Sequence, residues 1–360
     1  MGPKFKRRIL SIDGGGIRGI IPAIVLNYIE ERTGKRIATM FDFIAGTSTG
    51  GILALGLTKK NSDSSINREP EYTAAELVNF YRKYGGKIFN QNIPLDFDDL
   101  LQPRHKPQGR QEVLKDLLGE AKIEDALREI FIPSYDIELR VPIFFTSNPD
   151  AEEIKSFDSR KVCTGFKMWE AAMATSAAPT FFPPYKLDTG HHTDEGYYAL
   201  VDGGILANNP ASLAIMEAMI SYKKKTREEL HRKDTLVVSL GTGSLTKKYK
   251  YRDAKNWGQI KWALPLLNVF LDGQSESVAY QLNQLMVTKA DQENNRNYYR
   301  FQLPLSSDNG HDKIDNASPS NIDHLEERAE KLIEHSKKDL DELCKLLKEE
   351  TELYSNQPDS

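Results

Sequence analysis

The first sixty residues alternate short apolar runs with segments of helical periodicity. Residues 9–12 form an apolar run bounded by charge and glycine, and residues 19–32 follow with apolar positions at helical spacing. A second run at 41–45 and a second periodic segment at 50–58 repeat this order. Glycine-rich turns join strand to helix in both units. The pattern predicts two strand–helix units and therefore an α/β fold around a parallel sheet.

The pattern predicts further elements along the chain. Thr73 and Glu76 have the spacing of a capping box, which predicts a helix from there through Tyr84. The other predicted elements are strands at 136–139, 141–145 and 235–240 and helices at 167–175 and 210–222. The last of these helices closes with Lys223, Lys224 and Lys225, which favours a solvated helix end that complements the helix dipole over a binding patch.

Two segments in the second half of the chain are strongly apolar. Residues 325–347 carry apolar side chains on one stripe and charged side chains opposite, which favours one amphipathic helix packed on the core over a partner-binding helix. Residues 257–271 contain two tryptophans among leucine, valine and phenylalanine. This stretch suits a core helix, and tryptophan beside apolar residues also suits contact with a lipid interface.

Polar and proline-rich segments predict loops. Residues 60–72 are typical of a surface loop, and prolines interrupt residues 85–109. The second of these segments suits equally a surface insertion or a lid over a site. We therefore expect one domain over residues 1–335, with an insertion or lid region at 60–110, and an amphipathic helix with a polar tail at 323–360.

Composition narrows the class of protein. The 360 residues carry 48 lysines and arginines against 52 aspartates and glutamates, for a formal charge of −4, which lacks the basic excess of a dedicated nucleic-acid binder. Cys163 and Cys344 form neither a disulfide framework nor a zinc spacing. The apolar run at 9–12 is too short for a signal peptide, and no run is long enough to span a bilayer. We expect a cytoplasmic protein.

The first candidate site is Gly14-Gly15-Gly16-Ile17-Arg18-Gly19, between the first predicted strand and helix. It satisfies Gly-x-Gly-x-x-Gly, the spacing of a dinucleotide-binding loop. A dinucleotide domain also needs an acidic residue at the end of the second strand, and Ala45-Gly46-Thr47-Ser48 offers none. Backbone N–H groups at a helix N-terminus suit either a phosphate or a transient oxyanion.

The second candidate site is Gly46-Thr47-Ser48-Thr49-Gly50, which matches Gly-x-Ser-x-Gly between a strand and a helix. That context is typical of a nucleophile elbow, where the strained turn leaves no room for flanking side chains. Ser48 is therefore the candidate nucleophile. The seven histidines lie apart from other catalytic features, and the pair His191-His192, in the polar run 187–196, is only a weak candidate for a base or metal ligand.

A better candidate for the base is Asp202, in Val201-Asp202-Gly203-Gly204. The carboxylate follows an apolar lead-in, as at the tip of a strand. A free aspartate, with a pKa of about 3.9, is a poor base for serine. Burial and a hydrogen bond to the serine hydroxyl would make it a better one. On spacing alone, a structural aspartate in an Asx turn suits this segment equally well.

Together these segments resemble the patatin-like phospholipase family. Residues 13–19 match its anion-hole motif, residues 46–50 its serine elbow and residues 201–204 its base motif. Segments 174–184 and 239–243 also match, and the resemblance extends over about residues 7–335 in the family's order. It implies a three-layer α/β/α sandwich around a mainly parallel sheet.

The resemblance implies a lipid acyl hydrolase of phospholipase A type. Ser48 would be its nucleophile and Asp202 its only base, and the reaction would pass through an acyl-enzyme. The other residues that the resemblance assigns are Gly14, Gly15, Gly16 and Arg18 in the oxyanion hole and Gly46, Gly50, Gly203 and Gly204 in the two turns. It implies no metal and no cofactor.

The implied substrate is a membrane phospholipid or galactolipid, reached by peripheral contact with the bilayer. No nucleic acid polymer is expected as a partner, and the oligomeric state stays open. The family also includes effectors of bacterial anti-phage defence that a cyclic dinucleotide activates, so activation by a small nucleotide is a second hypothesis. The motifs also leave open a nucleotide-binding module built on the loop Gly14–Gly19 and an acyltransferase that uses the same serine elbow.

Overall fold

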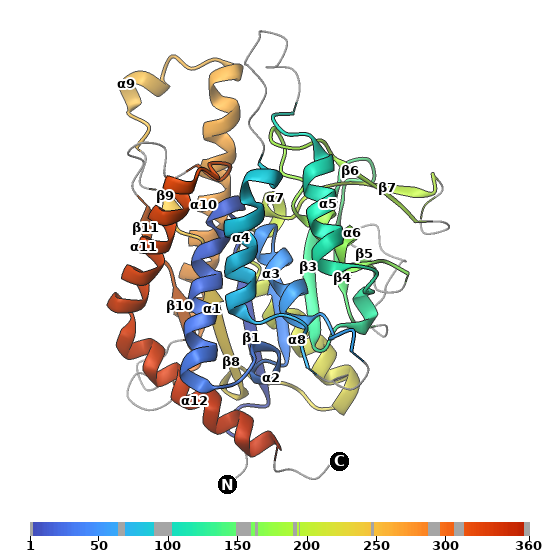
Figure 1. Cartoon of the computed structure of the whole chain (residues 1–360), viewed down its shortest axis with the longest axis vertical. Helices are drawn as coiled ribbons and strands as arrows, with labels where there is room; N and C mark the ends of the chain where they lie inside the picture. The colour runs from blue at the N-terminus through green and yellow to red at the C-terminus, as the bar shows by residue number, and fades with distance from the viewer. Residues whose placement is uncertain are drawn as a thin grey trace.

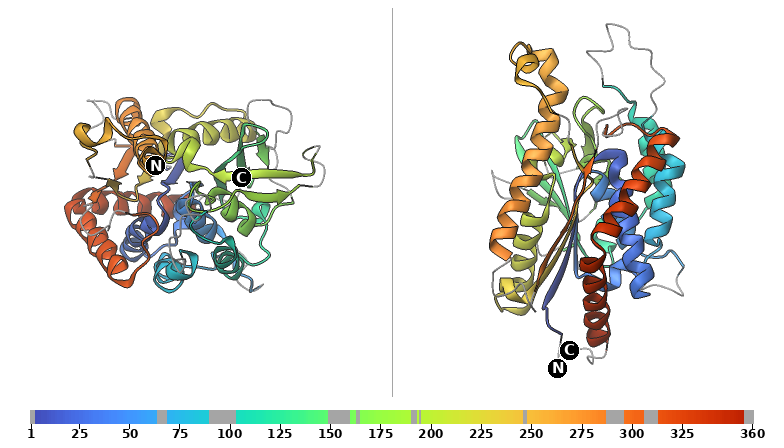
Figure 2. Two further views of the ribbon diagram at one scale, coloured as in Figure 1. Left: turned by 90° about the horizontal axis from the view of Figure 1, so that it is seen from above. Right: turned by 90° about the vertical axis from the view of Figure 1, so that its left-hand side faces the viewer.

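The computed structural model describes residues 3–63, 69–89, 103–148, 160–162, 165–189, 193, 195–245, 248–286, 296–305 and 313–355. Within these residues, nine strands form one mixed sheet, and helices cover both of its faces (Figures 1 and 2). The predicted three-layer α/β/α architecture is confirmed.

Parallel strands form the centre of the sheet. The strand order is β10-β8-β1-β2-β3-β4-β5, with β7 paired to β3 and β6 paired to β7. The parallel strands are β10 (Tyr298–Phe301), β8 (Thr235–Leu240), β1 (Arg7–Ile12), β2 (Phe43–Gly46) and β3 (Glu129–Asp136). The remaining strands of this sheet are β4 (Val141–Thr146), β5 (Arg160–Val162), β6 (Tyr185–Asp188) and β7 (Tyr197–Asp202). A small separate sheet pairs β9 (Ser244–Leu245) with β11 (Pro304–Leu305).

Helices of two groups pack on the two faces. One face is covered by α8 (Ala211–Thr226) and α10 (Gln259–Met286). The other is covered by α1 (Ile20–Thr33), α3 (Thr49–Thr58), α4 (Ala74–Ile88), α5 (Pro107–Leu118), α6 (Met168–Thr175), α11 (Pro319–His335) and α12 (Lys337–Ser355). Short helices are η1 (Gly16–Gly19), α2 (Ile37–Met40), η4 (Ile123–Asp125), α7 (Gly204–Ala207), η6 (Arg232–Asp234) and α9 (Tyr251–Ala254).

Alternation along the central strands divides the core in two. In β1, Ile9 joins the cluster beneath α8 and α10, whereas Leu10 joins the larger cluster on the opposite face. Phe43 and Val237, which pair with Ile9 on either side, face the same way as Ile9. Successive strand residues point to opposite faces of the sheet. A strand that is buried on both faces is therefore a continuous apolar run in the sequence.

Most predicted elements are confirmed. The strand predicted at 9–12 begins two residues earlier, and the helix predicted from Thr73 begins with the expected capping box. Thr73 Oγ1 accepts the Glu76 N–H at 3.0 Å, and Glu76 Oε2 accepts the Thr73 N–H at 2.8 Å. None of the helices in the described part of the chain is long and apolar enough to cross a bilayer.

The strand predicted at 136–139 is wrong. The strand lies upstream, as β3, and residues 137–140 turn into β4 with Arg140 at φ 59°. Asp136 forms this turn by accepting the N–H groups of Glu138 and Leu139 at 2.9 and 2.8 Å. Pro133 lies inside β3, and proline argues against a strand on sequence grounds, which explains the missed element.

The single C-terminal helix predicted over 325–347 is in fact two helices. α11 ends at His335 and α12 begins at Lys337, with Ser336 between them. Serine often caps helices, but neither glycine nor proline marks this break in the sequence. The expected packing is confirmed, because Leu325, Leu332 and Leu343 are buried in the larger core cluster.

The region expected to be an insertion or lid is partly helical. α4 continues to Ile88 and α5 begins at Pro107, so both ends of the proline-rich segment 85–109 are helices. Residues 64–68 and 90–102 lie outside the described residues, so the lid stays a prediction. Residues 190–192 and 194, in the polar run 187–196, also lie outside the described residues.

Truncation of the buried stripe on α12 should destabilise the fold. Leu343 is fully buried, and Leu343→Ala should lower the free energy of unfolding by about 2–5 kcal/mol, because it removes apolar contacts and leaves a cavity. Leu353→Ala, at an exposed position on the same helix, should change it by less than about 0.5 kcal/mol. Urea denaturation followed by circular dichroism measures both, and equal losses would contradict the packing described for α12.

Candidate active site

Ser48 lies in a strained turn between β2 and α3. Its backbone has φ 54° and ψ −120°, a conformation that residues other than glycine rarely adopt. Backbone segments approach closely around it: a Cβ at Gly46 would lie 2.0 Å from the Gly50 carbonyl oxygen, and one at Gly50 would lie 2.2 Å from that of Ile12. Gly46 and Gly50 are therefore required, because any side chain at either position would collide with the backbone.

The turn brings the Ser48 hydroxyl onto Asp202. Ser48 Oγ donates to Asp202 Oδ2 at 2.7 Å, although 154 residues separate the two in sequence. Asp202 ends β7, and its other oxygen, Oδ1, accepts the Gly204 N–H at 2.7 Å. Only 8% of Ser48 and 5% of Asp202 are exposed. Both carboxylate oxygens are therefore held in place, and one of them can take the serine proton.

Burial makes Asp202 a stronger base than a free aspartate. Desolvation raises the pKa of this carboxyl to about 6, while the hydrogen bonds from Ser48 and Gly204 and the positive charge of Arg110 act in the opposite direction. The carboxyl group is therefore mostly ionised at neutral pH. Its raised pKa also favours proton transfer from a serine hydroxyl.

Thr175, at the end of α6, connects Ser48 to β3, the strand that pairs with β7 at Asp202. Its Oγ1 accepts the Ser48 N–H at 3.0 Å and donates to the Pro133 carbonyl oxygen at 2.6 Å. Its own carbonyl oxygen accepts the Gly203 N–H at 3.1 Å. Thr175 thus positions both sides of the Ser48–Asp202 pair. This role could not be predicted from the sequence, since only the fold shows these contacts.

The glycine loop lies beside this pair, and its backbone N–H groups differ in whether they donate a hydrogen bond. The Gly14 N–H, expected in an oxyanion hole, instead donates to the Asn208 carbonyl oxygen at 3.0 Å. The N–H groups of Gly15 and Gly16 donate to no acceptor within the described segments. Both residues line the cavity that contains Ser48. Arg18 Nε donates to the Gly15 carbonyl oxygen at 3.3 Å, so this side chain supports the loop from within.

Close contacts fix the shape of this loop. Gly16 has φ 59°, and a Cβ there would lie 2.1 Å from the Ile314 carbonyl oxygen. Thr242 Oγ1 donates to the Gly14 carbonyl oxygen at 2.6 Å, which ties the loop to the segment after β8. A side chain at Gly15 would also collide with Thr242. The loop conformation therefore depends on glycine at these positions.

A buried ion pair anchors the start of the same loop. Arg300 of β10 binds both carboxylate oxygens of Asp13, with distances of 2.8 and 2.6 Å. The guanidinium also donates to Ser239 Oγ of β8 at 2.9 Å. The pair therefore joins three neighbouring strand ends. Arg300 could not be predicted as a site residue, because it lies 287 residues from Asp13 and in no recognisable motif.

Ser48 and Asp202 line a largely apolar cavity. About 790 Å³ of space, open mouth included, lies between α4, the segment after α6 and α10. The larger apolar side chains around it include those of Ile52, Phe80, Tyr81, Ile88, Phe89, Phe181, Phe182, Leu267 and Leu271. Such walls suit a hydrocarbon chain with its reacting carbonyl at Ser48.

Arg110 of α5 is an unexpected cation in this apolar wall. Its side chain is 1% exposed, its guanidinium carbon lies 4.1 Å from the centre of the Phe182 ring, and it donates to the Ser176 carbonyl oxygen. Burial lowers the pKa of Arg110 to about 10, so the group stays charged at neutral pH. Its charge lowers the pKa of Asp202. Nothing in the local sequence distinguishes this arginine from a surface residue.

The described part of the chain contains no group of three or more histidine, cysteine, aspartate or glutamate side chains that could bind a metal ion. The predicted weak candidate, His191-His192, lies outside the described residues.

Comparison with known proteins identifies relatives over most of the chain. The family model of the patatin-like phospholipases matches residues 10–215. Patatin-2-Kuras 4 of Solanum tuberosum is 33% identical over 343 residues, which cover 90% of this chain and 86% of the relative. Probable inactive patatin-3-Kuras 1 of the same organism is 32% identical, covering 91% and 86%. VipD from Legionella pneumophila aligns with 91% of this chain and 67% of its own at 14% identity, with a TM-score of 0.31, which is too low to bear on the fold.

A fluorophosphonate probe should modify Ser48 with a rate that follows the ionisation of Asp202. If Asp202 is the base, it can accept the serine proton only when it is ionised, so the rate should rise with pH through a midpoint near the Asp202 pKa of about 6. Ser48→Ala should remove labelling, and Asp202→Asn should slow it by about 10²-fold or more. Mass spectrometry of labelled peptides measures this, and rapid labelling of Asp202→Asn would exclude Asp202 as the base.

Replacement of Arg110 should move the same pH midpoint. Arg110→Gln removes a positive charge that lowers the pKa of Asp202, so the midpoint should shift to higher pH. Arg110→Lys keeps the charge and should keep the midpoint close to that of the unchanged protein. Circular dichroism checks that both variants fold, and a midpoint that Arg110→Gln leaves unchanged would contradict the electrostatic role of Arg110.

Proposed function

Because this chain belongs to the patatin-like phospholipase family, we propose that it is a lipid acyl hydrolase of phospholipase A type, with Ser48 as nucleophile and Asp202 as base. The observation that carries the proposal is the 2.7 Å hydrogen bond from Ser48 Oγ to Asp202 Oδ2 inside an apolar cavity. None of the described residues that line this cavity is a histidine, which supports a two-residue mechanism.

The first half of the reaction forms an acyl-enzyme. Ser48 Oγ attacks the carbonyl carbon of a fatty-acyl ester while its proton passes to Asp202 Oδ2. The tetrahedral intermediate then collapses, and the bond to the alcohol oxygen breaks. Asp202 returns the proton to the departing lysolipid oxygen, so the acyl chain stays on Ser48 as an ester.

The negative charge of the tetrahedral intermediate needs donors beside Ser48. The N–H groups of Gly15 and Gly16 are suited to this role, because both residues line the cavity and neither N–H has an acceptor within the described segments. They lie at the N-terminal end of η1, where backbone N–H groups favour an anion. Each such donor typically contributes a factor of about 10²–10³ to the rate. Arg18 would support this hole by fixing the Gly15 peptide.

The second half of the reaction releases the fatty acid. Asp202, again ionised, removes a proton from a water molecule that attacks the Ser48 ester. The second tetrahedral intermediate uses the same N–H donors, and its collapse returns the proton to Ser48. The net reaction consumes one ester and one water and yields one fatty acid and one alcohol.

A nucleotide-binding module receives less support from the site than a hydrolase. Such a loop would use its N–H groups for phosphate, but the Gly14 N–H already donates to the Asn208 carbonyl oxygen, and β2 ends without a carboxylate.

An acyltransferase would use the same acyl-enzyme with an acceptor alcohol in place of water, so product analysis with added alcohol distinguishes it from a hydrolase. Cyclic dinucleotides added to the assay test whether a small nucleotide activates the enzyme.

Purified protein should release fatty acid from glycerolipid vesicles. Ser48→Ala should abolish the release, and Asp202→Asn should reduce it by about 10³-fold or more, since the serine then lacks its base. Mass spectrometry of the lipid extract measures both the fatty acid and the lysolipid. Phosphatidylcholine, phosphatidylglycerol and galactolipid vesicles, assayed in parallel, determine the head-group preference. Equal release by the unchanged protein and Ser48→Ala would refute the proposed function.

A further inference from the structure

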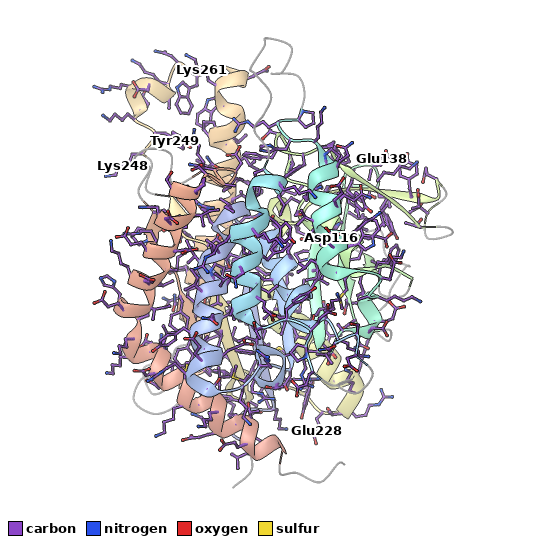
Figure 3. The ribbon with its side chains drawn as sticks, viewed as in Figure 1. Asp116, Glu138, Glu228, Lys248, Tyr249 and Lys261 are labelled. Carbon is purple, nitrogen blue, oxygen red and sulfur yellow. The ribbon has the colours of Figure 1, made fainter. Side chains whose placement is uncertain are left out.

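A cluster of exposed cations covers one end of the molecule. We use the term basic cap for residues 248–262, which include α9 and the first turn of α10. The cap carries five cations, all exposed, and one carboxylate: Lys248, Lys250, Arg252, Lys255, Lys261 and Asp253. Figures 1 and 2 show this end projecting beyond the sheet, and Figure 3 shows Lys248, Tyr249 and Lys261 there. The cap is therefore strongly positive although the whole chain has a formal charge of −4.

Aromatic rings lie between these cations. The Trp257 ring packs edge-on against Tyr249 and Trp262, with ring centres 5.4 and 5.1 Å apart. Tyr251 is 82% exposed. Tyrosine and tryptophan combine a large apolar ring with one polar group, and they favour the interface between water and lipid.

The next two turns of α10 expose aliphatic and aromatic side chains. Leu266, Val269 and Phe270 are 55%, 49% and 47% exposed, and with Trp262 they follow the i, i+4, i+7, i+8 spacing of one helix face. A contiguous exposed apolar patch of this kind marks an interaction surface. We call these four residues the apolar face of α10.

The same helix forms part of the active-site wall. Leu267 and Leu271, on its other side, line the cavity that contains Ser48. Farther along, Ser275 Oγ accepts the Asn208 side-chain N–H at 3.0 Å, and Asn208 in turn accepts the Gly14 N–H. A surface that engages α10 from outside therefore lies next to the reaction site.

We propose that the basic cap and the apolar face of α10 form the surface with which this protein docks on an anionic lipid bilayer. The cations lie among the anionic head groups, and the aromatic and aliphatic side chains enter the outer part of the hydrocarbon. This inference rests on the proposed function, because it supplies the route by which a lipid ester reaches Ser48.

Charge favours a bilayer over other occupants of the surface. A two-fold dimer through the cap would place five cations against five cations, which repel each other. A single-stranded nucleic acid would satisfy the cations and stack on the rings, but it would leave Leu266 and Val269 exposed to water. An anionic membrane satisfies both the charge and the apolar side chains.

Vesicle sedimentation tests the docking surface apart from catalysis. The full-length chain with Ser48→Ala keeps the lipid intact and should bind phosphatidylcholine vesicles containing phosphatidylglycerol, and much more weakly those without it. Adding Lys248→Glu, Lys250→Glu and Lys255→Glu should weaken binding by about tenfold or more. The matched control, Lys338→Glu, Lys345→Glu and Lys348→Glu on exposed positions of α12, lies at the opposite end of the molecule and should bind as before (Figure 1).

A second variant tests the apolar face. Part of the binding by the unchanged surface should survive high salt, because salt screens the cations but not the apolar contacts. Leu266→Ser with Phe270→Ser should keep the binding at low salt and lose what survives at high salt. Equal binding by the cap and control variants, or tighter binding of a single-stranded oligonucleotide than of anionic vesicles, would overturn the proposal.

Hydrolysis assays separate this inference from the proposed function. With Ser48 present, the cap variant should hydrolyse a short water-soluble ester at an unchanged rate and anionic vesicles about tenfold more slowly or worse. Loss of both activities together would overturn the docking role, because the cap would then be acting on the site itself. If the unchanged protein hydrolyses neither ester, the proposed function fails while the sedimentation result still decides whether the surface binds membranes.

Discussion

The buried hydrogen bond between Ser48 Oγ and Asp202 Oδ2 is the interaction on which the site depends. A carboxylate removed from water is costly, and this one is compensated by two short hydrogen bonds, from Ser48 and from the Gly204 N–H. These hydrogen bonds offset only part of the desolvation of the carboxylate. The pKa of Asp202 is therefore raised to about 6, which makes Asp202 a better base for serine. The same burial that makes Asp202 costly therefore suits it to the proposed chemistry.

The rest of the fold supports this contact from several directions. The parallel centre of the sheet brings the ends of β1 and β2 together, so the glycine loop and the serine elbow are neighbours. Thr175 connects the elbow to the turn after β7, and the Asp13–Arg300 pair anchors the start of the glycine loop. Helix α10 closes the cavity with Leu267 and Leu271. The outer face of α10 carries the surface proposed to dock on a bilayer. The same helix would therefore contribute both to the cavity wall and to the contact with the lipid.

Local patterns predicted much of this arrangement. The strand–helix units and the elbow around Ser48 are short segments whose glycines have a local physical reason, so the sequence was sufficient to predict them. At Asp202 the spacing left a base and a structural Asx turn equally open, and only the family resemblance favoured the base. Arg110, Thr175 and Arg300 act through contacts between elements that are distant in the chain, and no spacing encodes those contacts. The engagement of the Gly14 N–H by Asn208 likewise depends on how α7 meets the loop. The break at Ser336 was missed because both sides of it share one apolar stripe.

The most direct test of the Ser48–Asp202 mechanism is to look for the acyl group on Ser48. A short-chain ester mixed with the protein, quenched in acid within the first turnovers and digested, should yield the peptide containing Ser48 with the added mass of the acyl group. That adduct should be absent from Ser48→Ala. An acyl group on a different residue, or ester hydrolysis that survives in Ser48→Ala, would contradict the mechanism.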